Sequence, residues 1–212
     1  MLQFPLVTAD GEKRPIQGFL FDDRSWLIRY LVIEGGNWLA PRPLVVSTSA
    51  VEVPDRTKKC AQTQLTLQQV LSSPPAETVR PVSRQQEQAW SRHFGWPREE
   101  ARWHMPAIAA QREFEGCGED DPHLRRAGDL KGYEVWGAEG SIGQLMGYLV
   151  QDRSWHIGYL AVRAGDWVHG EQVISTQQVC EISWGEHRVW LEGAVGAPQD
   201  CEGDRPDGPA AA

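Results

Sequence analysis

Apolar and polar residues alternate between positions 16 and 33, and this alternation predicts a β-hairpin. Residues 16–21 form the first expected strand, and the polar residues 22–25 are typical of a turn. Residues 26–33 form the second strand, in which successive side chains point to opposite faces. One face then carries Trp26, Ile28, Tyr30 and Val32. The other face carries Leu27, Arg29, Leu31 and Ile33.

The hairpin occurs twice. Asp-Arg-Ser-Trp at 23–26 returns at 152–155, which is 129 positions later. Eight further residues recur at the same offset: Gly11, Gly18, Leu20, Ile28, Tyr30, Leu31, Gly36 and Trp38 return as Gly140, Gly147, Leu149, Ile157, Tyr159, Leu160, Gly165 and Trp167. An offset this long exceeds the period of a solenoid, so it predicts two copies of one small domain. The Trp/Ile/Tyr face persists in both copies, and we assign it to the core.

Shorter apolar runs predict further strands in each copy. The offset slips to 128 after the hairpin, so Val46-Ser47-Thr48 matches Ile174-Ser175-Thr176. The first copy has runs at 44–46 and 51–53, and the second has runs at 173–174, 179–182 and 188–191. The expected fold is therefore mainly β.

The segment between the copies predicts short helices. Thr66 and Gln69 match a capping box, with Leu65 and Val70 placed to pack as a staple and Pro74-Pro75 ending the helix. A second helix is expected over 83–95, with Trp90 and Phe94 one turn apart, and a third after Asp121-Pro122. The expected domains are 1–75 and 129–197, joined by a linker at 76–128 and followed by a disordered tail at 198–212.

These motifs together resemble a tandem PRC-barrel protein, a family that includes the cytoplasmic domain of the photosynthetic reaction-centre H subunit. The resemblance rests on Asp-x-x-Trp hairpins at 23–32 and 152–162 and Gly-x-Trp turns at 36–38 and 165–167. It also rests on linker segments at 81–85, 95–97 and 121–125. The resemblance implies two small antiparallel PRC-type β-barrels, used in the family as interaction and assembly modules.

Charge and composition narrow the functional classes. The formal net charge of −8 argues against a nucleic-acid partner, since phosphate backbones select basic surfaces. There is no apolar run near 18 residues and no secretory signal pattern at the N-terminus. The four cysteines form no Cys-x-x-Cys motif, so reduced thiols and a cytoplasmic location are expected.

Motifs for catalysis or cofactor binding are weak. No Gly-x-Ser-x-Gly elbow is present, and the Gly-rich segment 137–140 precedes an expected strand rather than a helix. Five potential metal ligands lie close together in the linker: Cys117, Glu119, Asp120, Asp121 and His123. Their spacing matches no known site, and the helix start at Asp121-Pro122 accounts for part of it. We therefore expect no catalytic, cofactor or metal site.

Tryptophan is the most useful candidate for a binding surface, because it is enriched at protein interfaces. Trp38 and Trp167 adjoin equivalent glycine turns, and Trp90, Trp96 and Trp103 lie in the linker. The alternative is that these side chains pack against the two domains. Positions where the copies differ are the other candidates: His156 replaces Leu27, Gly158 replaces Arg29, and only one copy carries the long linker.

The sequence thus predicts a non-catalytic protein that binds other proteins or itself, in the latter case as a homodimer. Two alternatives stay open. One is a peripheral component of a photosynthetic or electron-transfer membrane complex, associated with the membrane only through a partner. The other is a factor linked to ribosome or RNA maturation. Both alternatives rest on the family resemblance alone, and the sequence does not identify the partner.

Overall fold

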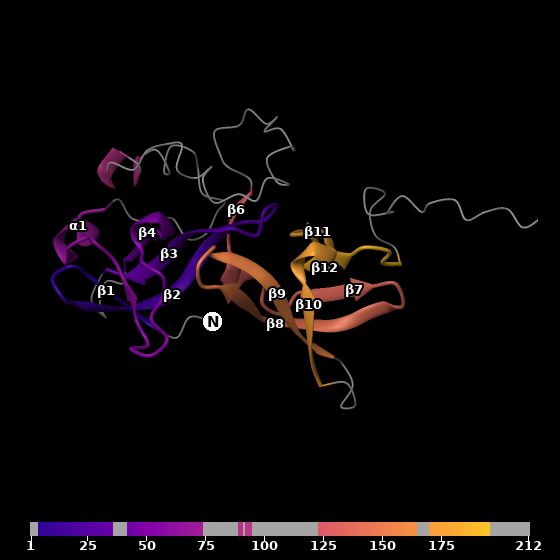
Figure 1. Ribbon diagram of the computed structural model, residues 1–212. Coiled ribbons are helices and arrows are strands. Elements are labelled where there is room, and N and C mark those ends of the chain that lie inside the picture. The colour runs from indigo at the N-terminus through magenta and orange to yellow at the C-terminus, as the bar shows by residue number, and fades with distance from the viewer. Residues whose placement is uncertain are drawn as a thin grey trace, which may run out of the picture. The chain divides into compact units, whose positions relative to one another are not determined.

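The computed structural model describes residues 4–35, 42–73, 89–90, 92–94, 123–164 and 170–195. The chain is mainly β and divides into two compact units (Figure 1). The first unit comprises residues 1–129 and 150–157, and the second comprises residues 130–149 and 158–212. The tip of the second copy's hairpin therefore belongs to the first unit.

The first sheet has the strand order β4-β3-β2-β1-β5, and β6 pairs with β2. Its strands are β1 (Pro5–Val7), β2 (Lys13–Asp22), β3 (Ile28–Glu34), β4 (Pro43–Ser47), β5 (Ala61–Gln62) and β6 (Leu124–Arg126). A 3-10 turn at Thr48–Ala50 follows β4, and the helix α1 spans Leu67–Leu71.

The second sheet has the order β10-β9-β8-β7-β12-β11. Its strands are β7 (Glu134–Gly137), β8 (Gly140–Gln151), β9 (His156–Ala164), β10 (Glu171–Ser175), β11 (Val179–Ser183) and β12 (Arg188–Leu191). A 3-10 turn at Ala127–Leu130 precedes it, and another at Thr176–Gln178 follows β10.

The two sheets repeat one topology. In each, three antiparallel strands adjoin a short strand that pairs in parallel with a strand from later in the chain: β1 with β5, and β7 with β12. The repeat seen in the sequence is thus a structural repeat. Within the described residues, neither sheet closes into a barrel, because no pairing joins the strands at its two ends.

The helix and the capping box predicted at Thr66 are confirmed. The Thr66 side chain accepts a hydrogen bond from the Gln69 backbone, and the Gln69 side chain accepts one from the Thr66 backbone. This reciprocal pair satisfies two N–H groups that the start of a helix otherwise leaves unpaired.

Two local predictions are wrong. The helix expected after Asp121-Pro122 is not present at 124–126, where β6 pairs with β2 instead. Leu124 is fully buried there, so tertiary pairing overrides the local helix-start signal. Residues 51–53 do not form a strand, and Val51 makes only an isolated bridge with Thr63.

The assignment of the core face also needs correction. In β3 both faces are buried, because Leu31 and Ile33 are as inaccessible as Ile28. In β9 the buried residues include Leu160 and Val162, whereas Tyr159 is 45% exposed. The Trp/Ile/Tyr face is therefore not the inner face in both copies, and what lies over it differs between them.

Candidate interaction surface

One face of the first sheet is built from β2, β3 and β4. Leu20 lies opposite Tyr30, and Val32 lies opposite Val45, which places the four side chains on one face of adjacent strands. All four are buried. We call these four residues the first-copy face. Leu124 from β6 packs at its border and is fully buried.

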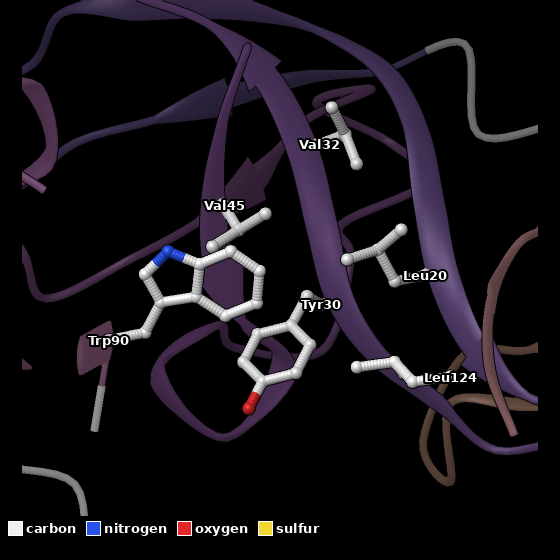
Figure 2. Packing of buried hydrophobic residues seen from close by; sticks show 6 residues of the cluster. All are labelled: Leu20, Tyr30, Val32, Val45, Trp90 and Leu124. Atoms are coloured by element: carbon white, nitrogen blue, oxygen red, sulfur yellow. The ribbon is translucent and has the colours of Figure 1, made fainter. Parts of the chain in front are cut away.

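Trp90 covers the first-copy face. Residues 89–90 and 92–94 are helical, and the Trp90 side chain is fully buried against Tyr30, with ring centroids 5.1 Å apart. Phe94, one turn along, packs against the same cluster. Figure 2 shows Trp90 beside Tyr30 and Val45. Of the two alternatives for Trp90, the structure supports packing.

The same short helix is held by polar contacts at the end of α1. The Nε2 atom of His93 lies 3.2 Å from the Ser72 hydroxyl and 3.2 Å from the Gln69 carbonyl oxygen. These contacts fix the helix while its apolar side chains cover the sheet. The cover of the first-copy face therefore depends on the helix α1 as well as on Trp90.

On the matching face of the second sheet, three of the four side chains are exposed. Its residues are Leu149, Tyr159, Ala161 and Val173, the repeat positions of Leu20, Tyr30, Val32 and Val45. We call these four residues the second-copy face. Leu149 is 49% exposed and Val173 is 58% exposed, and Val173 lies opposite Ala161 on neighbouring strands. Isolated exposed apolar residues are ordinary, but a group on one sheet face indicates a binding surface.

A charged pair borders this face. Arg163 lies opposite Glu171, two residues beyond the Ala161–Val173 pair, and the Arg163 Nη2 atom is 3.7 Å from the Glu171 Oε1 atom. Ser175 lies opposite Tyr159 at the other end. The face is thus apolar at its centre, with polar groups at both ends, which is the usual anatomy of a protein interface.

The repeated Asp-Arg-Ser-Trp motif lies in the hairpin turn of each copy, as the polar residues 22–25 predict. Asp22, one residue earlier, forms the turn: its Oδ1 atom accepts hydrogen bonds from the Arg24 and Ser25 backbone and from the Ser25 hydroxyl. A side chain at this position reaches N–H groups two and three residues ahead. In the second copy, Gln151 replaces Asp22 and accepts only the Ser154 hydroxyl among the bonds resolved there.

The motif aspartates lie in the hairpin turns, as predicted, and their carboxylates bind basic groups. Asp23 lies 2.9 Å from the Nδ1 atom of His123 and 3.7 Å from the Nε atom of Arg125. Asp152 lies 2.6 Å from the Nε atom of Arg56. The two equivalent carboxylates therefore link the hairpin tips to different parts of the first unit.

The motif tryptophans are packing residues, as predicted, but they do not begin the strands. Trp26 and Trp155 have φ values of 58° and 55°, a left-handed conformation that is uncommon for large residues. Both are 5% exposed. The Trp155 carbonyl accepts a hydrogen bond from the Ile28 backbone, and the Trp26 carbonyl accepts one from the Ile157 backbone. The two copies thus make the same pair of backbone hydrogen bonds to each other at equivalent positions.

Two positions where the copies differ lie beside these bonds. His156 forms an isolated antiparallel bridge with Leu27, its own counterpart in the repeat. Burial lowers the pKa of His156, and a hydrogen bond with the Ser25 backbone partly opposes that shift. Arg29 is half-buried, with its guanidinium 5.9 Å from the Tyr30 ring centroid. Both residues lie in local packing of the first unit.

Several predicted candidates lie outside the described residues: Trp38, Trp96, Trp103 and Trp167, and the possible metal ligands Cys117, Glu119, Asp120 and Asp121. Of the possible ligands, only His123 is described, and it contacts Asp23. The described residues contain no group of three or more His, Cys, Asp or Glu placed to hold a metal ion.

The cysteines do not all match the prediction of reduced thiols. Cys60 is a buried free thiol, whereas Cys180 is disulfide-bonded, with a partner outside the described residues. The expectation of four reduced thiols is therefore wrong for Cys180. Disulfides persist mainly in oxidising environments, so this bond removes one argument for a cytoplasmic location.

Sequence reasoning missed the residues of the second-copy face. The available signal was the asymmetry of the repeat: Leu149, Tyr159 and Val173 preserve the side chains of the first copy, but residues 192–212 contain no tryptophan. Assigning a covering segment to each copy would have left the apolar face of the second copy without one.

Comparisons with known proteins do not assign the chain to a family. No family model matches the chain, and no curated protein matches it. Among the described residues, no helix has the length and apolar character needed to cross a bilayer.

Proposed function

We propose that this chain is a non-catalytic protein-binding and assembly module, and that the second-copy face is its binding surface. The observation that carries the proposal is the exposure of Leu149, Tyr159 and Val173 at positions whose counterparts are buried in the first unit. Burying such side chains releases water from apolar surface, which is the main favourable term in protein association.

The PRC-barrel resemblance belongs to this proposal. It implies two barrels of one type, and the repeated strand order supports a common ancestral domain for both. The resemblance also implies that the domain acts by binding proteins. Neither the barrel architecture nor the family is needed for the argument from exposure, which stands on the described strands alone.

The test is affinity capture from the cells that naturally make the protein, with three full-chain baits. The wild-type bait is compared with Val173→Lys, which places a charge at the centre of the second-copy face. The matched control is Val195→Lys, since Val195 is 61% exposed and is not one of the four residues of the face. Quantitative mass spectrometry then measures which proteins each bait retains.

We expect at least one protein to be retained by the wild-type and Val195→Lys baits and lost from the Val173→Lys bait. A set of captured proteins that is identical for all three baits would contradict the proposal. Both substitutions are at exposed positions, so loss through unfolding is not expected. Circular dichroism of each purified bait checks this directly.

A further inference from the structure

We propose that the second-copy face binds an amphipathic helix of a partner protein, and that a tryptophan of that helix packs against Tyr159. This inference rests on the proposed function, because it names the chemical class of partner that the face takes. The first unit supplies the precedent, since Trp90 occupies the matching position against Tyr30.

The two faces have nearly the same side chains. Leu, Tyr and Val recur at three of the four positions, carried by strands of the same order and pairing. Strands of the same topology with the same side chains present similar surfaces. A surface that accepts an indole ring in the first unit therefore has the chemistry to accept one in the second.

The one difference within the face favours a large ligand side chain. Ala161 replaces Val32 and lies opposite Val173, so two methyl groups are missing beside the centre of the face. Met146 replaces Gln17 on β8 and is 39% exposed, so a polar residue of the first copy becomes an exposed, flexible apolar side chain on the same strand as Leu149. Methionine adapts its shape to different partners.

The border is charged but balanced. Where the first copy has Glu34, which accepts a hydrogen bond from Gln17, the second copy has Arg163 paired with Glu171. The face therefore attracts neither a strongly acidic nor a strongly basic ligand. An apolar helix stripe, recognised by residues one turn apart, fits this surface better than a charged polymer.

The helix cannot be the one already present in this chain. Trp90 is fully buried on the first-copy face, and His93 holds its helix to the end of α1. A second copy of the chain has its own Trp90 buried in the same way. The described residues hold no other tryptophan in a helix, so we assign the Trp-bearing helix to another protein.

The probe is a fluorescein-labelled peptide with the sequence of residues 83–95, which contains Trp90 and Phe94 and no other tryptophan. Its binding to the full-length protein is measured by fluorescence anisotropy. We expect saturable binding that weakens at least about tenfold with the Val173→Lys protein and is unchanged with Val195→Lys. Replacing Trp90 by Ala in the peptide weakens binding at least about tenfold, because tryptophan anchors carry most of such an interface. Replacing Gln88 by Ala leaves it unchanged.

Absence of peptide binding, or binding that is insensitive to Val173→Lys, overturns this inference. If the captured proteins still depend on Val173, the proposed function stands and only the Trp-helix ligand is wrong. The alternative occupant is a second copy of the chain, and sedimentation velocity tests for it. A dimer that is abolished by Val173→Lys and retained by Val195→Lys assigns the face to a second copy and overturns the inference. A wild-type monomer agrees with it.

Discussion

Two equivalent sheet faces of this molecule have nearly the same side chains and opposite environments. Leu20, Tyr30 and Val45 are buried in the first unit, whereas Leu149, Tyr159 and Val173 are exposed in the second. The difference does not come from the strands, which repeat in order and pairing. It comes from the linker residue Trp90, which is buried against Tyr30 on the first-copy face. Whether a residue on these faces is buried therefore depends on what packs over it, and not on the strand that carries it.

The sharpest test of this comparison is one substitution at matched positions. Val45→Lys places an ammonium group at a fully buried site, and we expect it to destabilise the first unit by more than about 4 kcal/mol. Val173→Lys changes stability by less than about 0.5 kcal/mol, because the side chain already faces solvent. Hydrogen exchange of β3 and β9, followed by mass spectrometry, measures each copy separately. Equal protection losses in the two variants would remove the distinction between the faces.

Removing the cover is the next largest perturbation. Trp90→Ala leaves a large cavity above Tyr30, and we expect it to cost about 3 kcal/mol. Tyr159→Ala deletes an aromatic side chain that is 45% exposed and costs less than about 1 kcal/mol. Urea unfolding followed by hydrogen exchange measures both. A Trp90→Ala variant as stable as the wild type would mean that the linker helix does not hold the first-copy face.

The hairpin turns provide a smaller contrast between the copies. Asp22→Ala removes the acceptor of three hydrogen bonds at a buried position, and we expect a loss of about 1–2 kcal/mol. Asp22→Asn keeps an acceptor oxygen and is the matched control, with a smaller loss. Gln151→Ala, the counterpart in the second copy, should change stability by less than about 0.5 kcal/mol. Thermal unfolding of the three variants ranks their losses of stability. An equal loss for Asp22→Ala and Gln151→Ala would contradict this prediction.

The smallest expected effect is the pH dependence at His156. Burial lowers its pKa below the usual value, so the unfolded chain binds more protons than the folded one as the pH falls through about 6.5. Stability from the neutral imidazole is therefore present above that pH and is lost below it. His156→Leu restores the residue found at position 27, and its stability should fall less than that of the wild type between pH 7.5 and pH 5. Parallel denaturation curves at each pH test this. Identical pH profiles would show that His156 does not titrate differently on folding.

Much of the local structure follows from the sequence. The strands at 16–21 and 44–46, the hairpin turns and the capping box at Thr66 each carry a signal within a few residues. The strand β6 does not, because its pairing with β2 lies about 100 residues away and competes with a local helix start. The role of Asp23 was missed for the same reason, since its partner His123 lies equally far along the chain.

The candidate site was only partly predictable. The sequence located the copies and directed attention to tryptophan and to the linker, and Trp90 is indeed central. However, it directed attention to the tryptophans that cover a sheet face and not to the sheet residues that are left exposed. Trp90 is the cover, and the uncovered residues are Leu149, Tyr159 and Val173, which look like ordinary core positions in a strand pattern. Periodicity separates the two faces of a strand but does not say whether one or both are covered.

The sequence by itself determined that one strand-rich domain is built twice, because a repeat of side chains at a constant offset specifies the same local pairings in both copies. Only the tertiary structure decided which of the equivalent faces is buried. Hydrophobic burial depends on area removed from water by neighbours in space. Those neighbours, Trp90 and Leu124, come from a segment that belongs to neither repeat, and both pack on the first-copy face.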